Sequence, residues 1–441
     1  MSFTDLNFIT RFLPIFLIVY YLVPSRYRGL VLFAGSMFCY GLGDVRRLLV
    51  LLALSAVNFT LIRLLSSKEG RSARALLAAG ISADAAVLIY YKYFSEEMIL
   101  GVSFFTFMMI AALVDVYRKD TKIPGASEYF SFVFMFPKLM QGPVIPLKDV
   151  SAELRHPKVT PAGLVSGLEY FIAGMALKVV IADEIGKLWM SVRTAGFESV
   201  STPLAWLGVI AFSMQLYFDF WGYSVMARGL GEMLGIPIMR NFNHPYMSVS
   251  VSEYYRRWHI SLGRWFREYI YIPMGGNRKG NARHIANLFF VWLLTGIWHG
   301  TTANFIIWAG VLFILVILEK KVYGDFLERH RCLGHIYIYS VIPLTWAVFA
   351  VENTGELAAF FSRLFPFGNP DALMIADALH YGPSYIWVAV LAVVVSLPKT
   401  EMLFEKYKGS VWMQAGMFVL MWICIWLIAT GSGNAFMYAR F

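Results

Sequence analysis

The sequence predicts an all-α, polytopic integral membrane protein that forms one domain over residues 1–441. Of its 441 residues, 58% are hydrophobic and only 15% are charged, and the mean hydropathy is +0.60. Soluble domains carry about 25% charged residues, so this composition argues against an ordinary soluble enzyme and a disordered scaffold. Apolar runs close to the ~20 residues that cross a bilayer recur along the chain, and they predict roughly 10–12 transmembrane or re-entrant helices.

The candidate spans follow one another along the chain with mostly short polar loops between them. They lie near residues 9–23, 29–43, 47–65, 74–91, 99–116, 163–182, 203–224, 285–300, 302–319, 336–351, 385–397 and 411–430. Several are shorter than a full crossing, which indicates tilted, re-entrant or interfacial segments. No basic region or small-residue cleavage site accompanies the first run, so we expect a retained span there and not a signal peptide.

The chain is basic, with a net charge of +10 and a pI of about 9.3. In a membrane protein, cytoplasmic loops rich in Lys and Arg account for such an excess, so we expect no nucleic-acid partner. Basic loops follow the first, third and fifth candidate spans, whereas Lys92 is an isolated base beside two glutamates in a loop of the other set. This alternation places the N-terminus outside and the basic loops in the cytoplasm.

The longest polar segment between spans, residues 228–283, contains nine Arg and Lys and three Glu, which places it on the cytoplasmic face. Within it, five apolar or aromatic residues recur at helical spacing and four polar residues fall on another face. The first set is Trp258, Leu262, Trp265, Phe266 and Tyr269, and the second is Arg257, Ser261, Arg264 and Glu268. We therefore expect one interfacial amphipathic helix over 252–271. A simple membrane anchor and a part of a reaction site both remain open for this helix.

Two histidines are candidates for chemistry. His299 lies in the apolar run 291–300, and an ionisable residue within an apolar span predicts a functional site. Its imidazole is suited to general-base catalysis near neutral pH, although a buried histidine bonded to a helix carbonyl is the alternative. His259 lies beside the aromatic stripe, and by itself it also fits an interfacial histidine with satisfied hydrogen bonds.

Other polar residues also lie in apolar surroundings. Asp219 is a candidate proton relay, a histidine orienter or the partner of a structural arginine. Lys138 lies in the stretch 136–143, which two prolines and a glycine break. Such breaks at membrane depth predict a re-entrant or pore-lining segment, in which Lys138 would face water or an anion.

A glycine-rich turn lies in the same basic region as His259. Gly275, Gly276 and Asn277 are followed by Arg278 and Lys279, and such a turn is able to hold a phosphate through backbone N–H groups and charge. Elsewhere, the three cysteines are far apart and show no metal-ligand spacing. We therefore expect neither a disulfide framework nor a metal site.

In their order along the chain, these motifs resemble the membrane-bound O-acyltransferases of the bacterial alginate O-acetylation type. The resemblance covers nearly the whole chain. It is carried by Phe12–Ile15, Tyr20–Pro24, Gly101–Phe107, Val114–Arg118, Phe136–Leu139 with Gly142-Pro143, Gln215–Phe220 with Gly222–Ser224, Arg256–Leu262, Tyr271–Pro273, Gly275–Arg278 and Trp298–Gly300. It implies helices arranged around a central tunnel.

The resemblance also implies an activity. It identifies His299 as the catalytic base and His259 as a supporting group. It implies transfer of an acyl group, usually acetyl, from cytoplasmic acyl-CoA to an extracytoplasmic polysaccharide, with no tightly bound cofactor. The setting would be the lipid of the bacterial cytoplasmic membrane, with a partner acetyltransferase outside it. The candidate donor and substrate residues are Arg256, Arg257, Trp258, Lys138, Gln141, Asp219, Tyr223, Asn277, Arg278 and Trp298.

Some residues depart from the family pattern, and two rival functions remain. Trp221 stands where relatives commonly have Ser, Val225 where they often have Asp, and Tyr254-Tyr255 where Phe-Trp is usual. These changes put in doubt an acid role at position 225 and the identity of the acceptor. The near rival is D-alanyl transfer to teichoic acid from a carrier protein, and the distant one is a transporter or flippase with a histidine proton relay.

The loop charges generate a topological prediction. We expect the N-terminus outside, and residues 63–74 and 228–283 on the cytoplasmic side. A cysteine placed at Ser67 should react with a thiol reagent only after the membrane has been permeabilised. Labelling of that cysteine in intact cells by an impermeant reagent would reverse the assignment.

Overall fold

The protein is built of helices, as the sequence predicts. The computed structural model describes residues 2–42, 45–95, 99, 101–138, 141–367, 370–432 and 436–437, and it contains no β-strand among them. Within these residues, seven helices are long and apolar enough to cross a membrane. They are Val45–Leu65, Gly70–Phe94, Pro161–Ala195, Thr202–Leu234, Arg331–Ala350, Ala376–Ser396 and Val411–Gly431. Phe8–Leu22 and Val102–Tyr117 are apolar but shorter.

The α-helices fall into three groups along the chain. The first comprises α1 (Leu13–Leu22), α2 (Ser25–Gly41), α3 (Val45–Leu65), α4 (Gly70–Ile89), α5 (Val102–Tyr117), α6 (Ala126–Phe134) and α7 (Ser151–Arg155). The second comprises α8 (Pro161–Ala176), α9 (Asp183–Ala195), α10 (Thr202–Leu234), α11 (Val251–Arg257) and α12 (Ile260–Phe266). The third comprises α13 (Asn281–His299), α14 (Ala303–Leu318), α15 (Gly324–Arg329), α16 (Arg331–Ala350), α17 (Thr354–Leu364), α18 (Ala376–Tyr381), α19 (Ile386–Ser396), α20 (Pro398–Tyr407) and α21 (Val411–Leu427).

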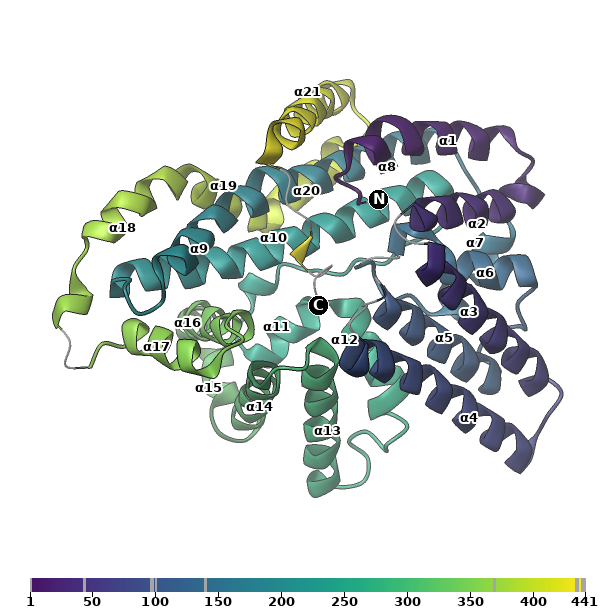
Figure 1. Cartoon of the computed structure of the whole chain (residues 1–441), viewed down its shortest axis with the longest axis horizontal. Helices are drawn as coiled ribbons and strands as arrows, with labels where there is room; N and C mark the ends of the chain where they lie inside the picture. Colours follow the sequence, from purple (N-terminus) through teal and green to yellow (C-terminus); the bar gives the residue numbers. More distant parts are fainter. Residues whose placement is uncertain are drawn as a thin grey trace.

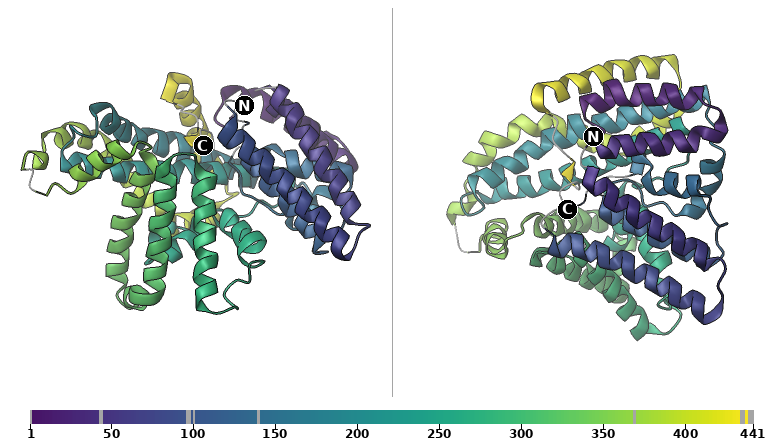
Figure 2. Two further views of the ribbon diagram at one scale, coloured as in Figure 1. Left: turned by 60° about the horizontal axis from the view of Figure 1, so that its bottom comes forward. Right: turned by 45° about the vertical axis from the view of Figure 1, so that its right-hand side comes forward.

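The long helices of the second group form the centre of the molecule. Figure 1 shows α8, α9 and α10 running across the middle, with the first group on one side and α14–α19 on the other. The green helices of residues 281–350 stand across these long helices in the left view of Figure 2. In Figure 1, α13 runs from a peripheral loop toward the middle of the molecule, so that its C-terminal end lies near the centre.

The boundaries of two central helices differ from the predicted spans. Helix α10 continues to Leu234 instead of ending near 224, and its 33 residues measure about 50 Å. Residues 161–195 form one long helix, whereas the predicted span covered only 163–182. This helix contains the π-helical segment Leu177–Ala182. Leu139 and Met140 of the expected re-entrant stretch lie outside the described residues.

Helices α8 and α10 approach each other at backbone distance because glycines face each other across the contact. A Cβ on Gly174 would lie 2.6 Å from the carbonyl oxygen of Gly222, and one on Gly167 would lie 2.5 Å from that of Gly229. Small residues permit such close approach between membrane helices, where van der Waals packing drives association. The seven-residue spacing on both helices makes this a repeated contact along one face.

A buried ion pair crosses the same contact. The Lys178 ammonium lies 2.7 Å from Asp219 of α10 and 2.6 Å from Asp183 of α9, and all three side chains are about 1% exposed. The backbone N–H of Met437 donates to the other oxygen of Asp219 at 3.0 Å. Asp219 is therefore held by a lysine rather than by the arginine considered from the sequence, and it joins α8–α9, α10 and the C-terminal segment.

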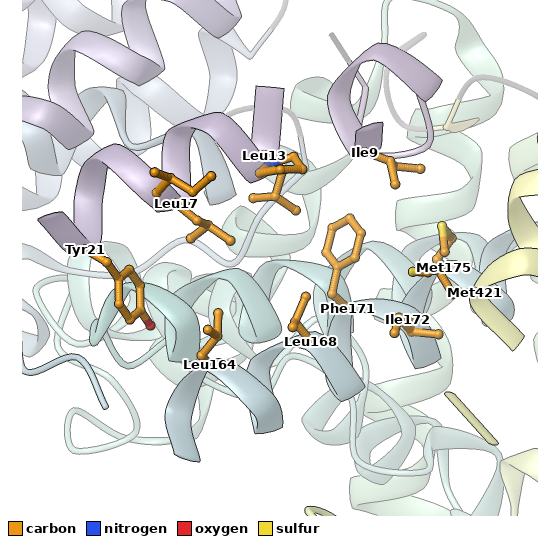
Figure 3. A pocket seen from close by; sticks show the side chains of 12 residues that line it. Ile9, Leu13, Leu17, Tyr21, Leu164, Leu168, Phe171, Ile172, Met175 and Met421 are labelled. Atoms are coloured by element: carbon orange, nitrogen blue, oxygen red, sulfur yellow. The ribbon is translucent and has the colours of Figure 1, made fainter. Parts of the chain in front are cut away.

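A purely apolar groove runs along the outer side of this layer. It has a volume of about 490 Å³ and lies between α1, α8 and α21. Figure 3 shows Leu13 and Leu17 of α1 facing Leu168 and Phe171 of α8 across it. The groove contains no charged lining residue, and its chemistry is that of a surface that faces lipid chains.

The glycine contact generates a prediction for stability. Gly174→Ala should destabilise the protein, because the added methyl group meets the Gly222 carbonyl and overpacking typically costs about 1–3 kcal/mol. Thermal unfolding of the detergent-solubilised protein measures the effect. Gly416→Ala on α21 is the matched control, because nothing lies within 4 Å of its Cβ and alanine is the better helix former. Equal unfolding temperatures for Gly174→Ala and wild type would contradict a backbone-limited contact.

Candidate active site

The predicted amphipathic helix over 252–271 is wrong, because the chain breaks at His259. Helix α11 ends at Arg257, α12 begins at Ile260, and His259 between them has φ 47° and ψ 53°. This left-handed conformation is uncommon for a residue other than glycine, and surrounding contacts must hold it. Two backbone hydrogen bonds do so: Ile260 N–H donates to the Asn241 carbonyl, and Asn243 N–H donates to the Arg257 carbonyl, both at 2.9 Å.

The aromatic residues of this segment are also buried in protein and do not form a membrane anchor. Trp258 and Trp265 are each 4% exposed. Trp258 packs on Tyr254 and Trp346, whereas Trp265 stacks on Phe107 of α5 with ring centroids 4.3 Å apart. The anchor alternative therefore fails, and the segment is part of the protein interior.

Asn241 fixes which nitrogen of His259 carries the proton. The Asn241 Oδ1 atom accepts hydrogen bonds from the Ser261 N–H at 3.1 Å and from the Ser261 hydroxyl at 2.9 Å, so this atom is an acceptor. His259 Nδ1 lies 3.2 Å from the same oxygen and must therefore be the donor. The amide nitrogen of Asn241 donates in turn to Ser224 of α10 at 3.2 Å. His259 consequently presents the unprotonated Nε2 as an acceptor.

That Nε2 atom is buried, and it has no hydrogen-bond partner among the described residues. The ring is 4% exposed and packs edge-on against Phe220, with centroids 4.7 Å apart. Burial lowers the pKa of His259 to about 3, so that the imidazole is neutral at physiological pH. A neutral imidazole with one free lone pair is able to accept the proton of a hydroxyl or to orient it.

His299 is the last residue of α13, and aromatic rings surround it. Its ring centroid lies 4.5 Å from that of Trp298, 5.1 Å from Trp308 and 5.1 Å from Phe349, and the side chain is 6% exposed. His259 and Lys92 lie close enough to His299 to act on it electrostatically. The two histidines expected from the sequence, which are forty residues apart in the chain, are therefore neighbours in the fold.

Lys92 is not the isolated loop base that the sequence suggested. It lies in the helix Gly70–Phe94, and its ammonium lies 5.7 Å from the ring centroid of Trp298. No sequence pattern indicates this contact, because residues 92 and 298 come from elements that only the tertiary fold brings together. Lys92 consequently belongs to the surroundings of His299.

Two indole N–H groups beside His299 lack partners among the described residues. They are the Nε1 atoms of Trp298 and Trp308, whose side chains are 9% and 2% exposed. Buried polar atoms are nearly always hydrogen-bonded in folded proteins, so unpaired ones near a histidine indicate a place for a polar ligand atom. The centre thus combines two unpaired donors with the unpaired acceptor of His259 in surroundings that exclude water.

The two arginines before Trp258 have different environments. Arg257 is paired with Glu253 at 2.7 Å, and it also donates to the carbonyl of Asn243 at 3.4 Å. Arg256 is exposed, and it has no ion pair among the described residues. Arg257 therefore holds α11 against the loop that contains Asn241, while Arg256 is the arginine that is available to a ligand.

The glycine-rich turn is remote from the two histidines. Asn277 and Arg278 are exposed just before α13, and His299 ends that helix. The 18 residue steps from Asn281 to His299 measure about 27 Å. The structure therefore separates this predicted phosphate turn from the histidine centre by the length of one helix.

Four further candidates gather near the break that precedes α7 and along α10. Lys138 is 1% exposed, and its ammonium lies 3.7 Å from the Phe132 ring centroid, without a hydrogen-bond partner among the described residues. The Tyr223 hydroxyl donates to the Pro137 carbonyl at 3.5 Å, and Gln141 is fully buried nearby in the chain. Asp219 is held by Lys178, as described above.

Asn241 is the residue of the site that sequence reasoning missed. It lies in a polar loop and carries no charge, so neither hydropathy nor loop charge distinguishes it. Ser261 was placed on the polar face of the predicted helix, but its bonds to Asn241 and to the backbone N–H of Val144 depend on the break at His259. No sequence pattern distinguished Asn241, since it stands 18 residues before His259.

The tautomer assignment generates a prediction. Nitrogen NMR of [15N]histidine-labelled protein should show His259 neutral, with the proton on Nδ1, between about pH 5 and pH 8, because its pKa lies below this interval. Asn241→Leu removes the acceptor and should abolish the preference for that tautomer. Asn353→Leu, which changes an exposed helix cap, is the control and should leave the His259 signal unchanged. A His259 that becomes cationic near pH 6 in the wild type would contradict the assignment.

Comparisons with known proteins identify the family of this chain. The family described as MBOAT, membrane-bound O-acyltransferase, matches residues 10–330. The chain is 35% identical to the probable alginate O-acetylase AlgI of Pseudomonas aeruginosa, over 84% of this chain and 76% of the relative.

Two more distant relatives have other printed activities. The chain is 28% identical to a peptidoglycan O-acetyltransferase of Helicobacter pylori, over 78% of this chain and 76% of that protein. It is also 28% identical to a teichoic acid D-alanyltransferase of Lacticaseibacillus rhamnosus, over 53% of this chain and 63% of that protein. This chain therefore belongs to the membrane-bound O-acyltransferase family and is a multi-pass membrane O-acyltransferase.

Proposed function

We propose that this O-acyltransferase moves an acetyl group from a cytoplasmic thioester, acetyl-CoA, to hydroxyl groups of an extracytoplasmic cell-surface polysaccharide. The observation that carries the proposal is the buried pair of His259 and His299, in which His259 offers a free acceptor nitrogen. The relatives named for alginate and for peptidoglycan O-acetylation support a polysaccharide acceptor, because both are aligned with most of this chain. The setting is the bacterial cytoplasmic membrane.

The proposed reaction within the histidine centre is one acyl transfer from the thioester to an acceptor hydroxyl. His299 accepts the proton of the attacking hydroxyl as its oxygen bonds to the thioester carbonyl carbon. The carbon–sulfur bond then breaks, and the proton passes to the departing thiolate, so that an ester and a thiol are the products. His259 accepts a hydrogen bond through Nε2 and orients the reacting group. The unpaired indole N–H groups of Trp298 and Trp308 donate to the carbonyl oxygen as negative charge develops on it.

The donor acts as a substrate in this proposal, and no tightly bound cofactor takes part. Arg256 lies three residues before His259 and is free to pair with a donor phosphate, whereas Arg257 keeps the supporting loop in place. We also propose a partner acetyltransferase outside the membrane, which completes delivery to the polymer. The surrounding lipid is the remaining partner and covers the apolar outer faces of the helices.

D-alanyl transfer to teichoic acid is the less well supported alternative. The relative with that printed activity is aligned with 53% of this chain, against 84% for the alginate relative. A neighbouring gene pair for a carrier protein and its ligase would favour D-alanyl transfer, whereas a gene for an extracytoplasmic esterase-like protein would favour the polysaccharide. Mass spectrometry of surface polymers from cells with and without this gene identifies the acceptor directly.

The proposed roles of the histidines predict unequal losses. His299→Ala should lose nearly all acyl transfer, because general-base catalysis typically contributes about 10²–10⁴-fold. His259→Ala should lose activity but retain a measurable remainder, because orientation is lost and the base remains. The measurement is polymer acylation in cells that carry each variant at equal membrane levels.

The exposed, unpaired base Lys122 supplies a control, since Lys122→Gln changes a side chain far from the histidines in the chain. Wild-type polymer acylation by His299→Ala would refute the mechanism. Equal and complete loss in both histidine variants, with normal folding, would refute the division of roles between base and orienting group.

A further inference from the structure

A group of basic side chains lies at the N-terminal end of α13, and only one of them, Arg256, has a role in the reaction described above. It consists of His284 in the first turn of α13, Lys320 and Lys321 after α14, and Arg256 on α11. Lys320 Nζ lies 3.0 Å from His284 Nε2, and Arg256 and Lys321 act electrostatically on Lys320. We name these four residues the basic cluster.

The hydrogen bonds within the cluster leave donors free. A lysine ammonium only donates, so Lys320 donates to His284 Nε2 and the proton of the imidazole lies on Nδ1. Nδ1–H then donates to the Tyr271 hydroxyl oxygen, 2.9 Å away, and the hydroxyl hydrogen of Tyr271 remains available to another acceptor. Two of the three ammonium hydrogens of Lys320 are also available.

No ion pair within the described part of the chain neutralises these charges. Among the described residues, Arg256, Lys320 and Lys321 take part in no ion pair, and Glu319 is occupied with the N–H groups of Val251 and Ser252. Partial burial, followed by the charges of Arg256 and Lys321, lowers the pKa of Lys320. Burial and the two lysines likewise lower the pKa of His284. Like charges held together in this way are stabilised by an anion that binds between them.

The cluster lies at a defined distance from the histidine centre. His284 and His299 are fifteen residues apart on α13, which is about 22 Å along the helix. Lys320 follows Trp308 by twelve residues on the helix beside it, which is about 18 Å. The distances along α13 and along the neighbouring helix therefore agree, and the basic cluster lies about 20 Å from the aromatic residues around His299.

This separation matches one kind of thioester donor. In a 4′-phosphopantetheine thioester, about 14 bonds separate the phosphorus from the acyl carbon, which gives about 17 Å when extended, at about 1.2 Å per bond. The remaining few ångströms are within the reach of the cluster's own long side chains. A phosphate held at the cluster would thus place the acyl carbon beside His299.

We propose that Arg256, Lys320 and Lys321, with Lys320 positioned by His284, form the binding site for the phosphate of a phosphopantetheine thioester, the group that CoA and acyl-carrier proteins share. The inference rests on the proposed function, since it assigns a donor class to the same reaction centre. It adds His284, Lys320 and Lys321 to the residues that bind or position the donor. It also explains the length of α13, which would set the distance between the donor phosphate and His299.

The test is binding without turnover. Calorimetry on the full-length, detergent-solubilised protein compares 4′-phosphopantetheine with pantetheine, which lacks the phosphate. Wild type should bind the phosphorylated arm at least about 10-fold more tightly, because hydrogen bonds to charged groups contribute about 1.5–3 kcal/mol. Lys320→Gln and Arg256→Gln should each weaken phosphopantetheine binding about 10-fold and leave pantetheine binding unchanged.

Two further variants sharpen the result. Lys320→Arg keeps the positive charge and should restore most of the affinity, and Lys122→Gln, with the same loss of charge on another exposed loop, should have no effect. Binding of pantetheine as tight as that of phosphopantetheine would overturn the inference. So would an equal loss for both ligands in Lys320→Gln.

The same calorimetric assay with CoA and with a phosphopantetheinylated carrier protein shows which of the two supplies the phosphate. Tighter binding of CoA than of phosphopantetheine, weakened by Lys320→Gln, supports the site and assigns it to CoA. Binding of the carrier with no advantage for CoA supports the site and assigns it to a carrier. If the protein shows phosphate-dependent binding but transfers no acyl group, the proposed function is contradicted and this site is not. If it transfers an acyl group without phosphate-dependent binding, only the site is contradicted.

Discussion

The backbone contact between α8 and α10 is the constraint on which the rest of the centre depends. Facing glycines let the two helices meet at carbonyl distance, and a methyl group on either side would separate them. That closeness allows Lys178 to reach Asp219, and the position of α10 in turn sets Ser224, which accepts from Asn241. The orientation of His259 therefore follows, through one amide, from the packing of two long helices.

Many buried polar groups in this protein are paired, and three of the unpaired buried atoms lie around the two histidines. The ion pair of Lys178 and the hydrogen bonds of Asn241 satisfy their atoms, as a low-dielectric interior requires. Against this background, the unpaired Nε2 of His259 and the unpaired indoles of Trp298 and Trp308 stand within one aromatic neighbourhood. Their grouping is the physical reason to place the reaction there and not near the glycine-rich turn.

The parts that the sequence predicted are those determined by local pattern. Long apolar runs identified a helical membrane protein, and two histidines in apolar or aromatic surroundings marked the centre. The break at His259 was not predictable, because a left-handed residue other than glycine is uncommon inside a helical pattern and tertiary hydrogen bonds impose it here. Asn241 and Lys92 escaped notice for a related reason, since their importance comes from contacts between elements far apart in the chain.

The arrangement of charge and aromatic surface also solves a problem that any thioester chemistry in a membrane protein faces. A base capable of activating a sugar hydroxyl would also activate water, so the histidine centre must exclude water while a polar donor enters. Trp298, Trp308 and Phe349 enclose His299 with apolar faces, whereas the uncompensated cations lie at the other end of α13, in contact with solvent. Charge recognition and chemistry are thereby separated by about 20 Å of helix. If the cations bind the donor as we propose, a long neutral arm must separate its charge from its acyl group, and a small acyl phosphate is too short to reach both ends at once.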